Sequence, residues 1–129
     1  MTYHFSKTIQ ADYEQAIAAL TKALQAEGFG VISTIDLKEK FKEKLEVDFR
    51  QYTILGACNP KLAYEAIQLE PHIGVMLPCN ILVQEKDSNS IEITAINPME
   101  TMQAVQNEKL STLAADVSRK LHNVINTLS

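Results

Sequence analysis

The chain has 129 residues, 46% of them hydrophobic, and a formal net charge of −4 with an isoelectric point near 5.3. This composition excludes a disordered chain and indicates one domain, 1–129, that is large enough to bury a core. The acidic balance makes a phosphate backbone a poor partner, and no apolar stretch approaches the roughly 20 residues of a membrane-spanning helix. We therefore expect no nucleic-acid partner and no membrane association.

The beginning of the chain predicts an edge strand followed by an amphipathic helix. Apolar and polar residues alternate over 3–9, and Lys7 interrupts the apolar face, which indicates the edge of a sheet. Asp12 is placed to cap a helix over 12–27, and Gly28 to end that helix in the left-handed conformation.

The next segments predict two strands, each followed by a capped helix. A strand over 30–35 runs into Asp36, which is suited to cap a short charged helix. A third strand over 52–58 leads to Asn59 and Pro60, a favourable N-cap and first helical residue. A helix over 60–70 follows.

The last part of the chain predicts a hairpin and a long helix. A fourth strand is expected over 73–84 with Pro78 inside it, and a polar loop over 85–90 leads to a fifth strand over 91–95. Apolar residues then recur at three-four spacing over 108–127, which predicts one long amphipathic helix.

The only two cysteines occur in two similar cassettes, Leu55–Pro60 and Leu77–Asn80. In each cassette the cysteine is followed by asparagine and lies within two residues of a proline, which suggests that the two segments meet in space. No signal-peptide pattern precedes them, so we expect a cytoplasmic location, where the cysteines are thiols by default.

Cys58 is the strongest candidate for chemistry, because it ends a strand directly before a predicted helix N-terminus. Unpaired N–H groups and the helix dipole favour a thiolate there, which would suit a nucleophile, a redox centre or a sulfur carrier. The alternative is a small apolar residue that fills the corner between strand and helix. Cys79 is either a core residue or, if Pro78 marks a bulge, a side chain aimed at a site.

Gly56 leaves a gap that either admits a ligand or another backbone, or is needed for packing. Two thiolates are too few for a closed zinc site, and no Gly-rich phosphate loop or serine-nucleophile motif is present. We therefore expect no metal and no cofactor, and the residues alone leave open whether the protein is an enzyme.

The segments Gly28–Val31, Val47–Tyr52, Ile54–Pro60 and Leu77–Asn80 resemble the DUF302 family, small bacterial and archaeal domains of unknown function. The resemblance covers nearly the whole chain and implies an α+β fold like the TATA-binding-protein repeat, β-α-β4-α. In this fold a single curved, mainly antiparallel five-stranded sheet carries the helices, here with an extra helix between strands 3 and 4. It also implies a homodimer, but no established activity, and the likeness to TATA-binding protein carries no inference about DNA.

These observations predict a small-ligand pocket near the two cassettes, in which Asn59 and Asn80 orient the ligand. The rival hypothesis is a thiol-based redox or sulfur-transfer protein that uses Cys58 with Cys79 as its partner. The predicted site residues are Gly56, Cys58, Asn59, Pro78, Cys79 and Asn80.

Overall fold

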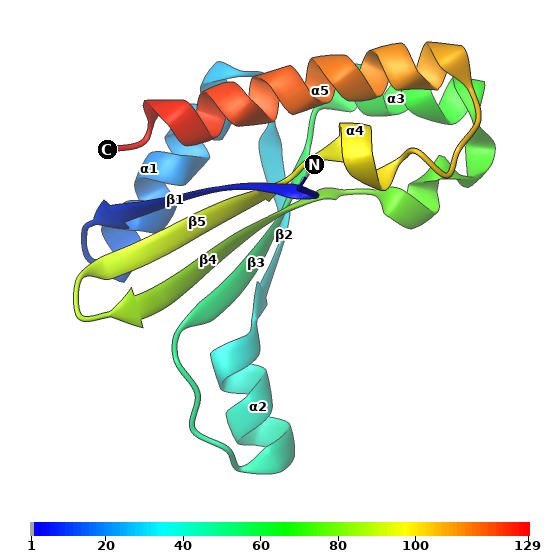
Figure 1. The fold of residues 1–129 in the computed structure, drawn as a ribbon. Coiled ribbons are helices and arrows are strands. Elements are labelled where there is room, and N and C mark those ends of the chain that lie inside the picture. Colours follow the sequence, from blue (N-terminus) through cyan, green and yellow to red (C-terminus); the bar gives the residue numbers. More distant parts are fainter. Residues whose placement is uncertain (1) are drawn as a thin grey trace.

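The computed structural model describes residues 2–129 and contains one antiparallel five-stranded sheet in the order β1-β5-β4-β3-β2 (Figure 1). The strands are β1 (His4–Gln10), β2 (Gly30–Asp36), β3 (Tyr52–Cys58), β4 (Cys79–Asp87) and β5 (Ser90–Ile96). The helices are α1 (Tyr13–Ala26), α2 (Leu37–Leu45), α3 (Pro60–Leu69), α4 (Pro98–Thr101) and α5 (Glu108–Thr127), with a 3-10 helix, η1 (Pro71–Met76). The predicted α+β class with a single sheet is confirmed.

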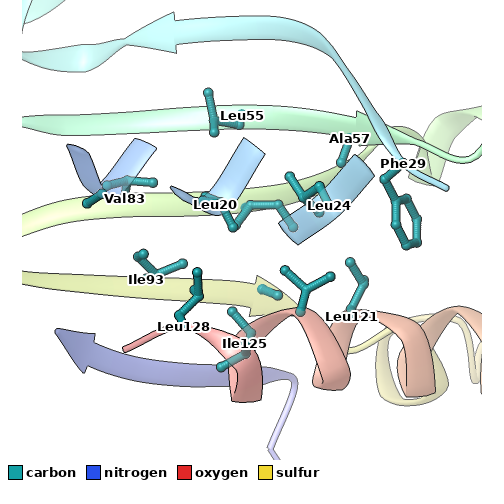
Figure 2. Packing of buried hydrophobic residues seen from close by; sticks show 14 of the residues in the cluster. Leu20, Leu24, Phe29, Leu55, Ala57, Val83, Ile93, Leu121, Ile125 and Leu128 are labelled. Carbon is teal, nitrogen blue, oxygen red and sulfur yellow. The ribbon is translucent and has the colours of Figure 1, made fainter. Parts of the chain in front are cut away.

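The main core lies between one face of the sheet and the helices α1 and α5 (Figure 2). Strand residues at alternate positions point to this face because side chains alternate across a strand. Above these strand residues, α1 contributes Leu20 and Leu24 to the core. α5 contributes Leu121 and Ile125 to the same cluster. The sheet residues in this cluster include Leu55, Ala57, Ile81, Val83, Ile91, Ile93 and Ala95.

Both predicted signals at the ends of α1 are confirmed. The Asp12 carboxylate accepts a hydrogen bond from the Gln15 N–H (2.8 Å), as an N-cap does. Gly28 has a φ of +87°, and the Phe29 N–H donates to the Leu24 carbonyl (2.9 Å) across the end of the helix. This closing turn brings the Phe29 ring into the core.

The prediction of a strand over 73–84 is wrong in its first half. Residues 71–76 form η1, and β4 begins only at Cys79, after a cis Leu77–Pro78 peptide bond. The prediction took the apolar residues of this segment as a sign of a buried strand. Val75 is in fact 89% exposed, so these residues do not mark a buried strand. Pro78 also lies outside the ladder, because β4 pairs with a strand on both sides and proline has no N–H to donate.

The two edges of the sheet differ. β1 is an edge strand, as Lys7 indicated, and the Lys7 ammonium donates to the Leu128 carbonyl at the end of α5. β2 forms the other edge, and α2 extends away from the body of the molecule beyond it, with no buried side chain (Figure 1). No helix of residues 2–129 is long and apolar enough to cross a membrane.

Candidate functional site

The two cysteine cassettes are neighbours at one end of the sheet. β3 and β4 run antiparallel, with Ala57 opposite Cys79 and Gly56 opposite Asn80. Cys58 ends β3, and Cys79 begins β4. Both thiols are free, with Cys58 half-buried and Cys79 only 7% exposed. The hairpin-like return of the chain through α3 and η1 is therefore what brings the cassettes together.

Cys58 and Cys79 are both among the residues that line one narrow apolar pocket between the end of the sheet and the helices α3, α4 and α5. Its free volume is about 40 Å³, enough for a few water-sized groups. Its walls are largely hydrocarbon and are formed by Phe29, Ala57, Cys58, Asn59, Leu62, Ala63, Ala66, Leu77, Pro78, Cys79, Pro98, Met102, Leu110, Leu113, Ala114 and Val117.

Burial raises the pKa of the Cys79 thiol to about 11, and the neighbouring Cys58 contributes to the same shift. Desolvation disfavours the charged thiolate, and a second negative charge nearby disfavours it further. At neutral pH Cys79 is therefore a thiol. Cys79 is also a member of the main hydrophobic core, so its thiol behaves as an apolar core group.

Asn59 uses both ends of its amide within the protein. Its Oδ1 accepts a hydrogen bond from the Leu62 N–H (3.3 Å), which confirms it as the N-cap of α3. Its Nδ2 donates to the Glu27 carbonyl (3.5 Å) at the end of α1. Asn59 therefore fixes α3 against the end of α1 on one side of the pocket.

The space beside Gly56 is filled by the chain itself. A Cβ built on Gly56 would lie 2.7 Å from Cγ of Pro78 and would also overlap the Ser33 hydroxyl. The sequence left open whether the gap beside Gly56 admits a ligand or another part of the chain. In the structure, the side chains of Pro78 and Ser33 occupy this space. Gly56 thus lets Pro78 fold over β3 beside the pocket.

The structure does not bring Asn80 to the same pocket. Asn80 and Leu82 point to the opposite face of the sheet from Cys79, where they line an open trough with Ile54 and Ile96. Four predicted residues, Cys58, Asn59, Pro78 and Cys79, therefore meet in the pocket. Gly56 lies behind Pro78, and Asn80 lies across the sheet.

Comparison with known proteins gives a match over residues 5–128 to the family described as "Domain of unknown function DUF302". The chain belongs to the DUF302 family. A crystal structure of an uncharacterized conserved DUF302 protein from Bacillus stearothermophilus is similar over 98% of both chains, with a TM-score of 0.89 and 26% identity.

A second relative of this DUF302 domain is an uncharacterized protein of Aquifex aeolicus (strain VF5). It is 26% identical over 85 residues, which are 66% of this chain and 53% of that protein. The match thus spans about half the length of this relative.

The sequence did not indicate the far wall of the pocket in this DUF302 domain. Met102 follows the short helix α4, and no periodic pattern marks it as a lining residue. The pocket-facing side of α5, with Leu110 and Ala114, was visible only as part of an apolar helix face. Within residues 2–129, no three His, Cys, Asp or Glu side chains gather in a group that could hold a metal ion.

Proposed function

We propose that this DUF302 domain binds a small ligand in the pocket that Cys58 and Cys79 line. The observation that carries the proposal is the convergence of the only two cysteines on one apolar pocket. Ligand sites are mostly apolar, and the lining of this pocket is largely hydrocarbon. We also propose a cytoplasmic location, which two unlinked cysteines are consistent with.

Protection of the thiols tests this function. Small ligands would be screened for a rise in melting temperature and for slower alkylation of Cys58 in the native protein, followed by mass spectrometry. Ala63→Leu should weaken binding at least tenfold, because Ala63 lines the pocket and a larger side chain takes up its volume. Asn80→Ala is the matched control, since Asn80 lies on the other face, and it should bind as the unaltered protein does.

Two outcomes would overturn the proposal. One is a broad ligand set in which nothing protects Cys58. The other is a ligand whose binding depends on Asn80 and not on Ala63, which would move the site to the trough on the outer face of the sheet.

The second candidate function is a thiol redox or sulfur-transfer protein. It is favoured by the shared pocket of Cys58 and Cys79, in which one thiol can attack a sulfur species formed on the other. The raised pKa of Cys79 weighs against it, since about one molecule in 10⁴ carries this thiolate at pH 7. Mild oxidation should give an intramolecular disulfide if this candidate is right, and unlinked oxidised thiols if it is wrong.

We also propose that the domain forms a homodimer through β2. The edge strand β2 presents unpaired N–H and C=O groups, and Ile32 and Ile35 are 64% and 44% exposed beside them. Leu45 and Val47 extend this apolar surface along α2 and the chain after it. Antiparallel pairing of two β2 strands would supply hydrogen-bond partners for these N–H and C=O groups and would cover the exposed apolar side chains.

A further inference from the structure

The outer face of the sheet, opposite α1 and α5, carries an open trough with a free volume of about 480 Å³. Sites for small organic molecules usually measure about 300–1,000 Å³, so a whole small molecule fits here. The main core and its helices lie on the other face of the same strands. The trough is therefore separate from the pocket beside the cysteines, and a ligand in it goes beyond the proposed function.

The floor of the trough is aliphatic, although the solvent face of an antiparallel sheet is usually polar. Leu82 of β4 pairs with Ile54 of β3, so their side chains lie about 5 Å apart on the same face. Ile96 follows Thr94, the partner of Leu82 on β5, by two residues and lies diagonally to Leu82. All three aliphatic side chains are only half-buried. Such a surface favours a ligand with a hydrocarbon body.

Glu92 places a carboxylate beside this floor. Gln84 is its direct partner on β4, and Leu82 lies diagonally to it. The Gln84 Nε2 donates to Oε1 of Glu92 (3.1 Å), and the Lys86 Nζ lies 3.9 Å from the same oxygen. Among the contacts of residues 2–129, none uses Oε2 of Glu92. This oxygen is therefore available to a ligand.

The charges around the trough favour a cation. No lysine or arginine of residues 2–129 belongs to its lining, whereas Glu92 does. Arg50 is engaged nearby, because it donates to Oε1 of Gln84 (3.0 and 3.2 Å) and its guanidinium lies 4.5 Å from the centre of the Phe49 ring. An anion would meet the Glu92 carboxylate without a lining cation to compensate it. The net charge of −4 acts in the same direction.

We infer that the trough binds a small organic cation, with its ammonium group at Glu92 and its hydrocarbon body over Leu82, Ile54 and Ile96. The ammonium N–H donates to Oε2 of Glu92 in a charge-assisted hydrogen bond. The hydrocarbon body covers the three aliphatic side chains and removes their surface from water. No bond in the ligand is broken or formed.

The test is an NMR titration of isotope-labelled protein with hexylamine, hexanol and hexanoate, which share one hydrocarbon chain and differ in charge. We expect hexylamine to shift the backbone resonances of Leu82, Glu92 and Thr94 and to bind about tenfold more tightly than hexanol. Hexanoate should cause no shift. Glu92→Gln should lower the affinity for hexylamine to that for hexanol and leave hexanol binding unchanged. Glu65→Gln is the matched control, because it removes the same charge from an exposed position on α3.

The floor is tested by Leu82→Ser, which should weaken the binding of hexylamine and hexanol alike, because both use the hydrocarbon surface. Leu82 is half-buried on the outer face, and Glu92→Gln keeps the test decisive if this variant fails to fold. Alkylation of Cys58 separates this site from the pocket. Hexylamine in the trough should leave the alkylation rate unchanged, and absence of hexylamine binding leaves the proposed function standing.

Several results would overturn the inference. Equal affinity for hexylamine and hexanoate would contradict a cation site, and equal effects of Glu92→Gln and Glu65→Gln would remove Glu92 from it. Shifts that gather outside the trough, or no shifts at all, would refute the site itself. Resonances of Leu82 and Thr94 that change with protein concentration in the absence of ligand would show that a second copy of the chain covers this face instead.

Discussion

Gly56 is the residue whose replacement has the most direct steric consequence. The Cβ of Gly56→Ala would meet Cγ of Pro78 at 2.7 Å and the Ser33 hydroxyl, so the Pro78 segment must shift. We expect a loss of about 1–3 kcal/mol in the free energy of unfolding, as for other overpacked sites. Urea denaturation measures it. Gly30→Ala is the control, because nothing lies within 4 Å of its added Cβ, and an equal loss in both variants would contradict the steric argument.

The Cys79 thiol makes stability depend on pH in the alkaline range. Its pKa is raised by burial, and secondarily by Cys58, from about 9 to about 11, so the unfolded chain releases this proton at lower pH than the folded one. The contribution of Cys79 to the free energy of unfolding is therefore complete below pH 9. It is lost as the pH rises from 9 to 11, which lowers the free energy of unfolding by about 2–3 kcal/mol. Denaturation of the unaltered protein and of Cys79→Ala at several pH values measures the difference. Parallel pH profiles would contradict the assignment.

At the scale of elements, Tyr13 fastens the start of α1 to the sheet. Its hydroxyl donates to the Val83 carbonyl of β4 (2.7 Å) and lies 2.7 Å from the Thr53 hydroxyl of β3. Thr53 is buried, so Tyr13→Phe leaves two polar groups without this partner and should cost about 1–3 kcal/mol of unfolding free energy. Tyr64→Phe, on an exposed face of α3, should change it by less than about 0.5 kcal/mol. Thermal unfolding of the two variants checks this.

Elements with local signals could be predicted from the sequence, and those that depend on tertiary contacts could not. The caps Asp12, Asp36 and Asn59 fix helix starts through bonds within three residues, so their positions agree with the prediction. The segment before Cys79 failed because alternation and apolarity cannot distinguish a buried strand from η1, where Glu70 accepts from the His72 N–H (2.8 Å).

The same limit applies to the candidate site. The cassettes could be identified as special from their repeated Cys-Asn pattern, and β3 does lie beside β4. Adjacent residues of a strand point to opposite faces, so Asn80 lies across the sheet from Cys79, and the predicted site, which grouped the two, did not take this alternation into account. Met102 reaches the pocket only through the fold of α4 and α5, which leaves no pattern in the sequence.

At the scale of the whole molecule, the uncovered β2 edge predicts self-association. Ile32→Lys should weaken the dimer at least tenfold, because it places a charge on the exposed apolar edge. Thr8→Lys, an exposed position on the opposite edge strand, should leave it unchanged. Light scattering after gel filtration over a concentration series measures the dissociation constant. A monomer at every concentration, or equal weakening by both variants, would refute the β2 interface.

The strand order also determines when the fold can be completed during translation. β1 precedes the other strands of this sheet along the chain, yet its partner is β5, and the Ser6–Thr94 hydrogen bond (2.9 Å) joins residues 88 positions apart. β1 therefore stays unpaired until β5 has been made, whereas β2 pairs with β3, the next strand along the chain. Such distant pairing slows folding, so β1 is the strand of this sheet that stays exposed longest before its partner is available.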